Sequence, residues 1–196
     1  EDFCAMPSSQ RTSFAEIMGE KIVNYWNSIN QATKVHILQF TFTYDNDNVF
    51  GNYALKTESS FSYQLIKLNH MLIEQALAFR NLFWIDLDMI QQKVGQSRFY
   101  DQRMYNIAKM PFTLEALPEV AKGVLDVVQA LHGRLHKCVI LDLDNTLWGG
   151  IIGDDGIENI QIGELGQGRA FTDFQRWLKE LKNRGILLAV CSKNQE

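Results

Sequence analysis

Two spacings of apolar residues alternate along the chain and predict two kinds of secondary structure. Positions three and four residues apart predict helices over residues 9–31, 60–80 and 169–183, and a further helix from between Pro111 and Pro118 to about Leu131. Continuous apolar, β-branched and aromatic runs predict buried strands over residues 34–43, 82–87, 138–143 and 186–191. Strands that alternate with helices favour an α/β fold.

Polar and glycine-rich stretches separate these elements. Residues 44–57, rich in Asn and Asp, are predicted to form a loop, and residues 97–110 are expected to be partly irregular. Glycine-containing turn signals predict short hairpin strands over residues 148–163. Gly185 is typical of the left-handed residue that ends a helix.

A short polar and basic segment, residues 133–137, is the predicted domain boundary. It divides the chain into an N-terminal α/β domain over residues 1–134 and a second domain over residues 135–196. Strand, helix and strand follow one another in the second domain and predict a right-handed βαβ unit. The chain starts at Glu1 without a Met and ends at Glu196 just after a predicted strand, so we expect a fragment of a longer protein.

Composition narrows the class of protein. The 196 residues are 46% hydrophobic and 21% charged, as in ordinary globular proteins. A net charge of −4 argues against non-specific nucleic-acid binding, and no apolar run approaches the length of a membrane span. The three cysteines are odd in number and far apart, which argues against a disulfide framework. Cys138 and Cys191 lie in apolar runs, so we expect buried thiols and a cytoplasmic protein.

The strongest chemical signal directly follows the strand predicted over residues 138–143. Asp142, Asp144 and Thr146 stand at alternate positions at the carboxyl end of this strand, where ligands of open α/β sheets bind. Two such carboxylates can share one Mg2+, which prefers oxygen ligands. One carboxylate can attack phosphorus while the other transfers protons. The alternative reading is that Asp142 and Asp144 only form a turn.

A second polar group follows the last predicted strand. Ser192 is expected beside Asp142, where its hydroxyl can bind a phosphoryl oxygen, and Lys193 and Asn194 come next. Taken alone, Ser192 and Asn194 can also be explained as turn-forming residues after a strand. The acidic stretch at residues 45–48 is a weaker cation candidate, and a solvated loop tip explains it better.

These residues carry a resemblance to a known family. The run LDLDNTLWGG, followed by CSKN, resembles motifs I and II of the haloacid dehalogenase (HAD) superfamily. The longer runs KCVILDLDNTLWGGIIGDDG and FQRWLKELKNRGILLAVCSKN resemble its FkbH-like branch, over roughly residue 61 to the end. The block FYDQRMYNIAKMPFTLEALP resembles the segment before the phosphatase-like domain. The resemblance implies an SGNH-hydrolase-like, three-layer α/β domain followed by the first half of a HAD-like (Rossmannoid) parallel-sheet domain.

The resemblance also implies roles. Asp142 matches the nucleophile and metal ligand, and Asp144 matches the acid/base residue whose backbone carbonyl reaches Mg2+. Thr146 and Ser192 match the hydroxyl residues of motifs I and II, whereas the motif III lysine and the acidic ligands of motif IV are expected beyond residue 196. The upstream domain lacks the Gly-Asp-Ser motif of SGNH hydrolases. Asp101 stands where a remnant of their late Asp-x-x-His block would be, with Met104 in place of the histidine.

The resulting hypothesis is a Mg2+-dependent phosphatase or phosphoryl-transfer enzyme that acts on a small phosphorylated metabolite through an aspartyl-phosphate. The FkbH resemblance implies loading of a phosphorylated three-carbon acid onto an acyl carrier protein. Arg98, Arg103 and Lys109 form the densest basic cluster of the upstream domain and are the candidate carrier dock, although they also fit a merely solvated surface. The alternatives are a non-catalytic scaffold of a biosynthetic complex and, less favoured, an upstream esterase.

Overall fold

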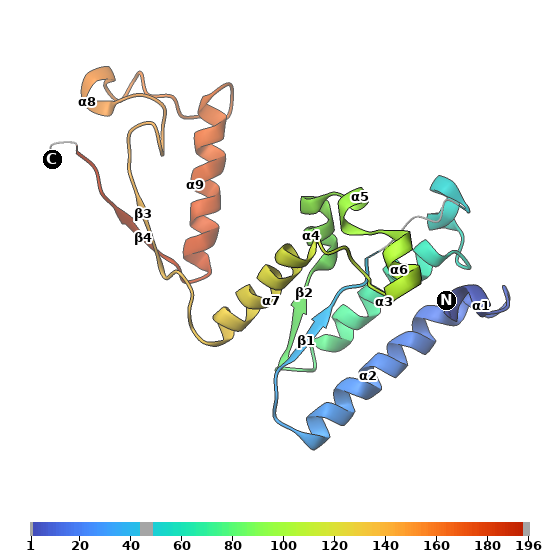
Figure 1. The fold of residues 1–196 in the computed structure, drawn as a ribbon. Helices are drawn as coiled ribbons and strands as arrows, with labels where there is room; N and C mark the ends of the chain where they lie inside the picture. The colour runs from blue at the N-terminus through green and yellow to red at the C-terminus, as the bar shows by residue number, and fades with distance from the viewer. Residues whose placement is uncertain (1, 44–48, 194–196) are drawn as a thin grey trace. The chain divides into compact units, whose positions relative to one another are not determined.

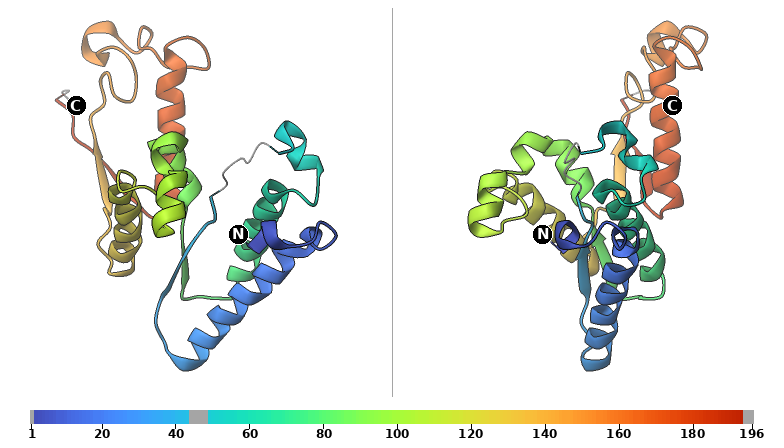
Figure 2. Two further views of the ribbon diagram at one scale, coloured as in Figure 1. Left: turned by 45° about the vertical axis from the view of Figure 1, so that its right-hand side comes forward. Right: turned by 90° about the vertical axis from the view of Figure 1, so that its right-hand side faces the viewer.

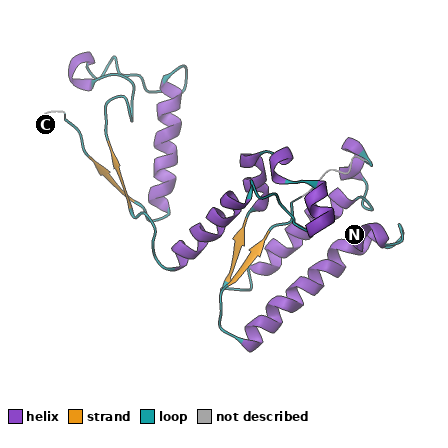
Figure 3. Ribbon diagram, viewed as in Figure 1, coloured by secondary structure: helices purple, strands orange, loops and turns teal. Residues whose placement is uncertain are grey.

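The computed structural model describes residues 2–43 and 49–193. The chain forms two compact units, Glu1–His132 and Gly133–Glu196 (Figure 1). Each unit combines helices with a two-stranded parallel sheet, as Figure 3 shows in purple and orange. This mixed architecture agrees with the predicted α/β class. None of the helices in the described ranges combines the length and apolarity that crossing a membrane requires.

The first unit is mostly helical. Its elements are α1 (Asp2–Ala5), η1 (Arg11–Ser13), α2 (Phe14–Ala32), β1 (Ile37–Phe40), η2 (Gly51–Lys56), α3 (Phe61–Ala76), β2 (Leu82–Ile85), α4 (Leu87–Val94), α5 (Gln96–Phe99), α6 (Gln102–Ala108) and α7 (Leu117–Leu131). The helices predicted over residues 9–31, 60–80 and up to Leu131 correspond to α2, α3 and α7.

The two strands of the first unit pair in parallel and are covered on both faces. Ile37 of β1 lies across from Leu82 of β2. These two side chains and Trp26 belong to one apolar cluster, built with α2 and α3, which lie side by side in both views of Figure 2. Ile85 and Val120 belong to a second cluster, built with α4 and α7. The parallel, doubly covered strands were predicted, but each is only four residues long.

Two predictions for the first unit need correction. The strand predicted over residues 82–87 ends at Ile85, because the Asp86 side chain accepts a hydrogen bond from the Met89 N–H (3.0 Å) and caps α4. The loop predicted over residues 44–57 contains the 3-10 helix η2. The acidic stretch at residues 45–48 lies outside the described residues.

The second unit contains β3 (Cys138–Leu141), α8 (Ile152–Asp155), α9 (Gly168–Asn183) and β4 (Leu187–Val190). The strands pair in parallel, as predicted, and α9 connects them along the chain. Gly185 has a φ of 95°, the left-handed conformation expected after this helix. The segment predicted to form hairpin strands instead holds the short helix α8 and one antiparallel bridge between Gly149 and Gln161.

The burial expected for the second sheet is wrong. Leu141 is buried, but Ile140 is 70% exposed and Leu187 is 67% exposed. Cys138 and Cys191, expected to be buried, are exposed as well. Successive strand residues face opposite sides of a sheet, and in the described part of this unit α9 is the long helix beside it, so it shields one face. An apolar run in the sequence therefore predicts these strands correctly, but it does not show that both faces of their sheet are buried.

Candidate functional site

Both strands of the second unit end at the same edge of their sheet. Leu141 lies across from Val190, and the Cys191 N–H donates a 2.8 Å hydrogen bond to the Leu141 carbonyl. Continuing this register places Cys191 across from Asp142 and places Ser192 one residue further along. The predicted polar residues thus leave the sheet at one edge, but Ser192 is not directly opposite Asp142.

Asp142 is the exposed carboxylate of this edge. Its Oδ1 accepts a hydrogen bond from the N–H of the next residue, Leu143 (2.8 Å). Within the part of the chain that the structure describes, no other side-chain hydrogen bond or ion pair engages this carboxylate. Asp142 can therefore present an oxygen to an incoming ligand.

Asp144 is held in a different environment. Its Oδ1 accepts hydrogen bonds from the indole Nε1–H of Trp148 (3.0 Å) and from the backbone N–H of Ile152 (3.1 Å), and its side chain is half-buried. Two donors on one oxygen fix the orientation of the carboxyl group. The two aspartates therefore differ: one is accessible, and the other is tied to the loop that follows it.

A sharp loop makes this second arrangement possible. Asn145 has a φ of 55°, in the left-handed region that Asn tolerates better than most residues. Its side-chain Oδ1 accepts from the Gly150 N–H (2.9 Å), and its own N–H donates to the Gly150 carbonyl (3.3 Å). The loop closes on itself and returns Trp148 to Asp144.

The remaining predicted residues are spread over the two strand ends. Thr146 is half-buried in the loop after β3, and its N–H donates to the Leu143 carbonyl (3.2 Å). Ser192 is half-buried and Lys193 is exposed after β4. Asn194 lies outside the described residues. One loop therefore carries Asp142, Asp144 and Thr146, and the neighbouring strand end carries Ser192 and Lys193.

Two side chains that organise this edge did not stand out in the sequence. One is Trp148, whose indole N–H donates to Asp144. Gln175 of α9 donates from Nε2 to the Leu147 carbonyl (2.6 Å) and ties the helix to the loop. In the sequence, the only indication of this role is that Gln175 is a polar residue next to the apolar stripe of α9, between Phe171 and Leu178.

The donor chemistry of this edge fits Mg2+ in part. The Asp142 carboxylate and the backbone carbonyl of Asp144 would hold the ion, because both present the oxygen atoms that Mg2+ prefers. Across residues 2–43 and 49–193, no cluster of three His, Cys, Asp or Glu side chains could hold a metal ion. These two residues would therefore fill only part of an octahedral shell.

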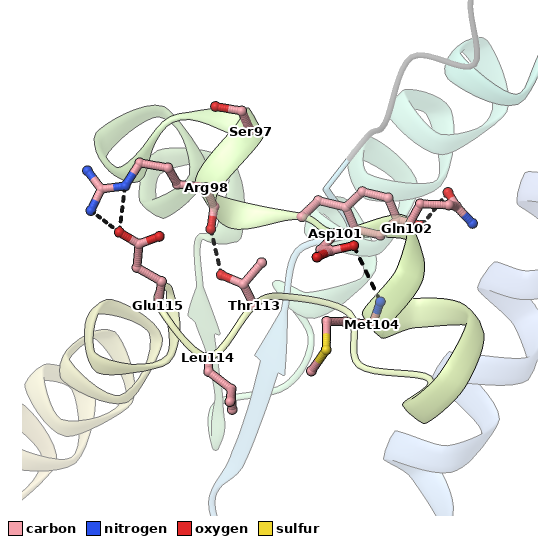
Figure 4. A pocket seen from close by; sticks show the side chains of 9 residues that line it. Ser97, Arg98, Asp101, Gln102, Met104, Thr113, Leu114 and Glu115 are labelled. Carbon is pink, nitrogen blue, oxygen red and sulfur yellow. Dashed lines mark hydrogen bonds and ion pairs between the residues drawn. The ribbon is translucent and has the colours of Figure 1, made fainter.

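The first unit has a shallow depression of about 540 Å3 around Asp101 (Figure 4). The Asp101 Oδ1 accepts hydrogen bonds from the N–H groups of Arg103 (2.7 Å) and Met104 (3.4 Å), so Asp101 caps α6. Arg98, one of the predicted docking cations, is paired with Glu115, and this hydrogen bond raises the pKa of the guanidinium. Helix capping therefore accounts for Asp101 without any hydrolase role.

Comparisons with known proteins add family information to this geometry. The model of the FkbH N-terminal domain matches residues 1–129, which reaches further upstream than the resemblance read from residue 61. A solved structure from Bacteroides fragilis, the N-terminal part of the protein BF1531, is described as containing a phosphatase domain complexed with Mg. It is 39% identical over 100% of this chain, with a TM-score of 0.85. This chain covers 51% of that one, about half its length. No protein with curated function matches.

Proposed function

Because this chain belongs to the FkbH family, whose N-terminal domain matches residues 1–129, we propose that its second unit carries a HAD-type, Mg2+-dependent phosphoryl-transfer site. The main support is the strand edge itself, where a loop with two aspartates and Thr146 leaves β3 beside the end of β4. The similarity to a solved protein with a phosphatase domain and Mg gives further support.

In this proposal Asp142 is the nucleophile. Its exposed carboxylate oxygen attacks the phosphorus of a phosphate ester, the bond from phosphorus to the leaving oxygen breaks, and an aspartyl-phosphate forms at Asp142. Asp144 donates its proton to the leaving oxygen. Asp144 then takes a proton from a water molecule, and this water attacks phosphorus, which releases phosphate and restores the Asp142 carboxylate. Bound Mg2+ would neutralise charge on the phosphoryl oxygens.

The hydrogen bonds of Asp144 suit this proton-transfer role. Trp148 and Ile152 donate to its Oδ1 and keep the carboxyl group in one orientation. A carboxyl group that is already held in one orientation needs less rearrangement before it can transfer a proton. Among the described residues, only the N–H of its neighbour Leu143 holds the Asp142 carboxylate, which suits a group that must reach the substrate.

The phosphoryl oxygens would be bound by the hydroxyls of Thr146 and Ser192, together with Lys193 and Asn194, which follow Ser192 in the sequence. Hydroxyl and ammonium donors are the groups that stabilise negative charge on a transferring phosphoryl group. Lys193 is exposed directly after Ser192 and can supply the positive charge of this set.

The more specific form of the proposal is the FkbH-like reaction. A phosphorylated three-carbon acid would be dephosphorylated while its acyl group is passed to an acyl carrier protein. Arg98 is paired with Glu115, and the Lys109 ammonium lies over the Tyr105 ring, 5.2 Å from its centroid, so Arg103 is the best candidate of the three for contact with an acidic carrier. A plain phosphatase acting on a small phosphorylated metabolite is the simpler form, and a non-catalytic scaffold is the alternative.

The test uses the native-length protein with Mg2+ and p-nitrophenyl phosphate. D142N should lower phosphate release by at least about 10²-fold, because an amide keeps the shape but cannot attack phosphorus. D154N is the matched control, since Asp154 is an exposed carboxylate of α8 in the same unit, and its rate should stay near that of the unchanged protein.

Peptide mass spectrometry of the quenched reaction should locate phosphate on Asp142. Equal rates for D142N and the unchanged protein would rule out the covalent mechanism, and no activity in either would favour the scaffold. Addition of the cognate carrier and a phosphorylated three-carbon acid separates the two enzymatic forms. An acylated carrier supports the transferase, and free phosphate with an unmodified carrier supports the phosphatase.

A further inference from the structure

The first unit contains a cavity of about 940 Å3 beside the end of β1. We propose that this cavity binds an uncharged small molecule with a flat apolar body and hydrogen-bonding polar groups. Its walls include residues 39–43, at and just after the carboxyl end of β1, and Leu87 and Gln91 of α4. The carboxyl ends of strands are where open α/β sheets bind ligands, and this volume is ample for a drug-sized molecule.

The walls of this cavity lack acidic, basic and histidine side chains among the described residues. Aromatic rings supply much of the surface, from Phe3, Phe40, Phe42, Phe61, Tyr105 and Phe112. A charged ligand entering here would lose water without gaining a counter-charge, which is costly. Flat apolar groups would instead be favoured by the rings. The lining formed by the described residues therefore selects against phosphates, carboxylates and ammonium groups.

Part of the polar lining is already used by the fold. The Thr41 hydroxyl accepts from the Leu87 N–H (2.9 Å), and the Gln39 amide accepts from the Trp26 indole (3.0 Å) and donates to the Phe40 carbonyl (2.9 Å). These groups hold β1 in place. Because their hydrogen bonds are made within the protein, we do not assign ligand binding to these groups.

Other polar groups suit a neutral ligand. The Tyr100 hydroxyl donates to the Gln102 Oε1 (3.0 Å), and the Gln102 Nε2 donates to the Asn106 Oδ1 (3.1 Å). At the α6 end of this series, the side-chain N–H groups of Asn106 make no hydrogen bond within the described part of the chain, so they can donate to a ligand. On the α4 side, the Gln91 side-chain amide makes no hydrogen bond within the part of the chain that the structure describes. Gln91 thus offers a donor and an acceptor to a neutral polar group.

All the lining residues lie between Phe3 and Phe112, in the first unit. The strand edge with Asp142 belongs to the second unit. The inference therefore stands independently of the proposed phosphoryl transfer, and the two can fail separately.

The experiment compares two dyes with one skeleton. N-phenyl-1-naphthylamine is neutral, and 1-anilinonaphthalene-8-sulfonate adds a single negative charge to it. In fluorescence titrations of the native-length protein, the neutral dye should bind at least about tenfold more tightly, because the sulfonate would be desolvated without a partner.

Charged substitutions at Gln91, which lines the cavity, test whether the dyes bind there. Q91E should weaken the neutral dye at least about fivefold, because the variant carboxylate must be desolvated when the dye fills the cavity. Q91K should shift the preference toward the sulfonated dye, because its ammonium supplies the missing counter-charge. Gln92, the exposed neighbour on α4 outside the lining, gives the matched controls Q92E and Q92K, which should leave both affinities unchanged.

Circular dichroism establishes that the variants are folded. Equal binding of the two dyes, no binding of the neutral dye, or identical effects of the Gln91 and Gln92 variants would each overturn the proposal.

Discussion

The side chain of Gln64 joins three segments of the first unit. It is fully buried, with 0% exposure, at the start of α3. Its Oε1 accepts from the Ala15 N–H (2.9 Å), and its Nε2 donates to the carbonyls of Thr12 (3.0 Å) and Glu58 (2.7 Å). A buried amide that satisfies three backbone groups is a structural requirement of this fold.

We expect Q64L to lower the free energy of unfolding of the first unit by about 2–4 kcal/mol, because it leaves buried backbone groups without partners. Q75L is the matched control on the same helix, where the side chain is exposed, and should change stability by less than about 0.5 kcal/mol. Native-state hydrogen exchange of the α3 amides measures both. Equal exchange in the two variants would contradict the importance of the three hydrogen bonds.

Single residues also show what the sequence could indicate about the strand edge. Residue type and position relative to the strands single out Asp142, Asp144 and Thr146, and this information is local. The contact between Trp148 and Asp144 depends on how the loop closes, which requires Asn145 in the left-handed region. No periodicity indicates such a closure, so the different environments of the two aspartates were not predicted.

At the scale of elements, long amphipathic segments were predicted well and short elements poorly. The helix predicted over residues 169–183 is observed as Gly168–Asn183, because its apolar stripe extends over four turns. The hairpin predicted over residues 148–163 is wrong, because local hydrogen bonds prevail there. The Asp155 carboxylate accepts from the Ile151 N–H (2.8 Å) and favours a compact turn over extended pairing.

Gly168, the first residue of α9, lies close to the backbone of residues 162 and 163. A Cβ atom at Gly168 would lie 2.9 Å from the Ile162 carbonyl carbon and 3.0 Å from the Gly163 nitrogen. These are backbone atoms, and Gly163 is held by hydrogen bonds to the Thr172 hydroxyl (3.2 and 2.9 Å). G168A should therefore destabilise the second unit by about 1–3 kcal/mol, since overpacking against fixed backbone forces a shift.

The matched control is G153A in α8, where an added Cβ meets no atom within 4 Å. It should be neutral or slightly stabilising, because alanine reduces the freedom of the unfolded chain. Hydrogen exchange of the α9 amides distinguishes the variants. Unchanged protection in G168A would mean that the turn moves away from α9 at little cost.

At the scale of the whole molecule, the two units carry different chemistry. The cavity of the first unit is lined by aromatic and neutral polar groups, whereas the strand edge of the second carries carboxylates, hydroxyls and Lys193. The family match covers residues 1–129 and thus nearly all of the first unit, but the motifs that suggested phosphoryl transfer lie in the second. The proposed activity and the proposed ligand are therefore tested by substitutions in separate units.

The segment between the units is the expected site of first cleavage by trypsin. Residues 132–138 are all exposed, residues 134–137 belong to no helix or strand, and residues 134–136 make no hydrogen bond within the described part of the chain. The Lys137 carbonyl accepts from the Leu187 N–H (2.8 Å), so we expect cleavage after Arg134 before Lys137. Cleavage after Arg80 is expected to be slower, because the side-chain amide of the next residue, Asn81, donates a hydrogen bond to the Val35 carbonyl (2.6 Å) and holds this turn in place.

Limited digestion of the native-length protein, followed by mass spectrometry, should show a first cut after Arg134. R134Q should delay the first cut by at least about threefold, because the other basic residue of this segment that can be cleaved, Lys137, has its carbonyl bound by the Leu187 N–H. R184Q is the control, since Arg184 caps α9 and its N–H donates to the Glu180 carbonyl (3.0 Å), and it should leave the rate of the first cut unchanged. A first cut at another site would contradict the prediction that the backbone after Arg134 is the most accessible to trypsin.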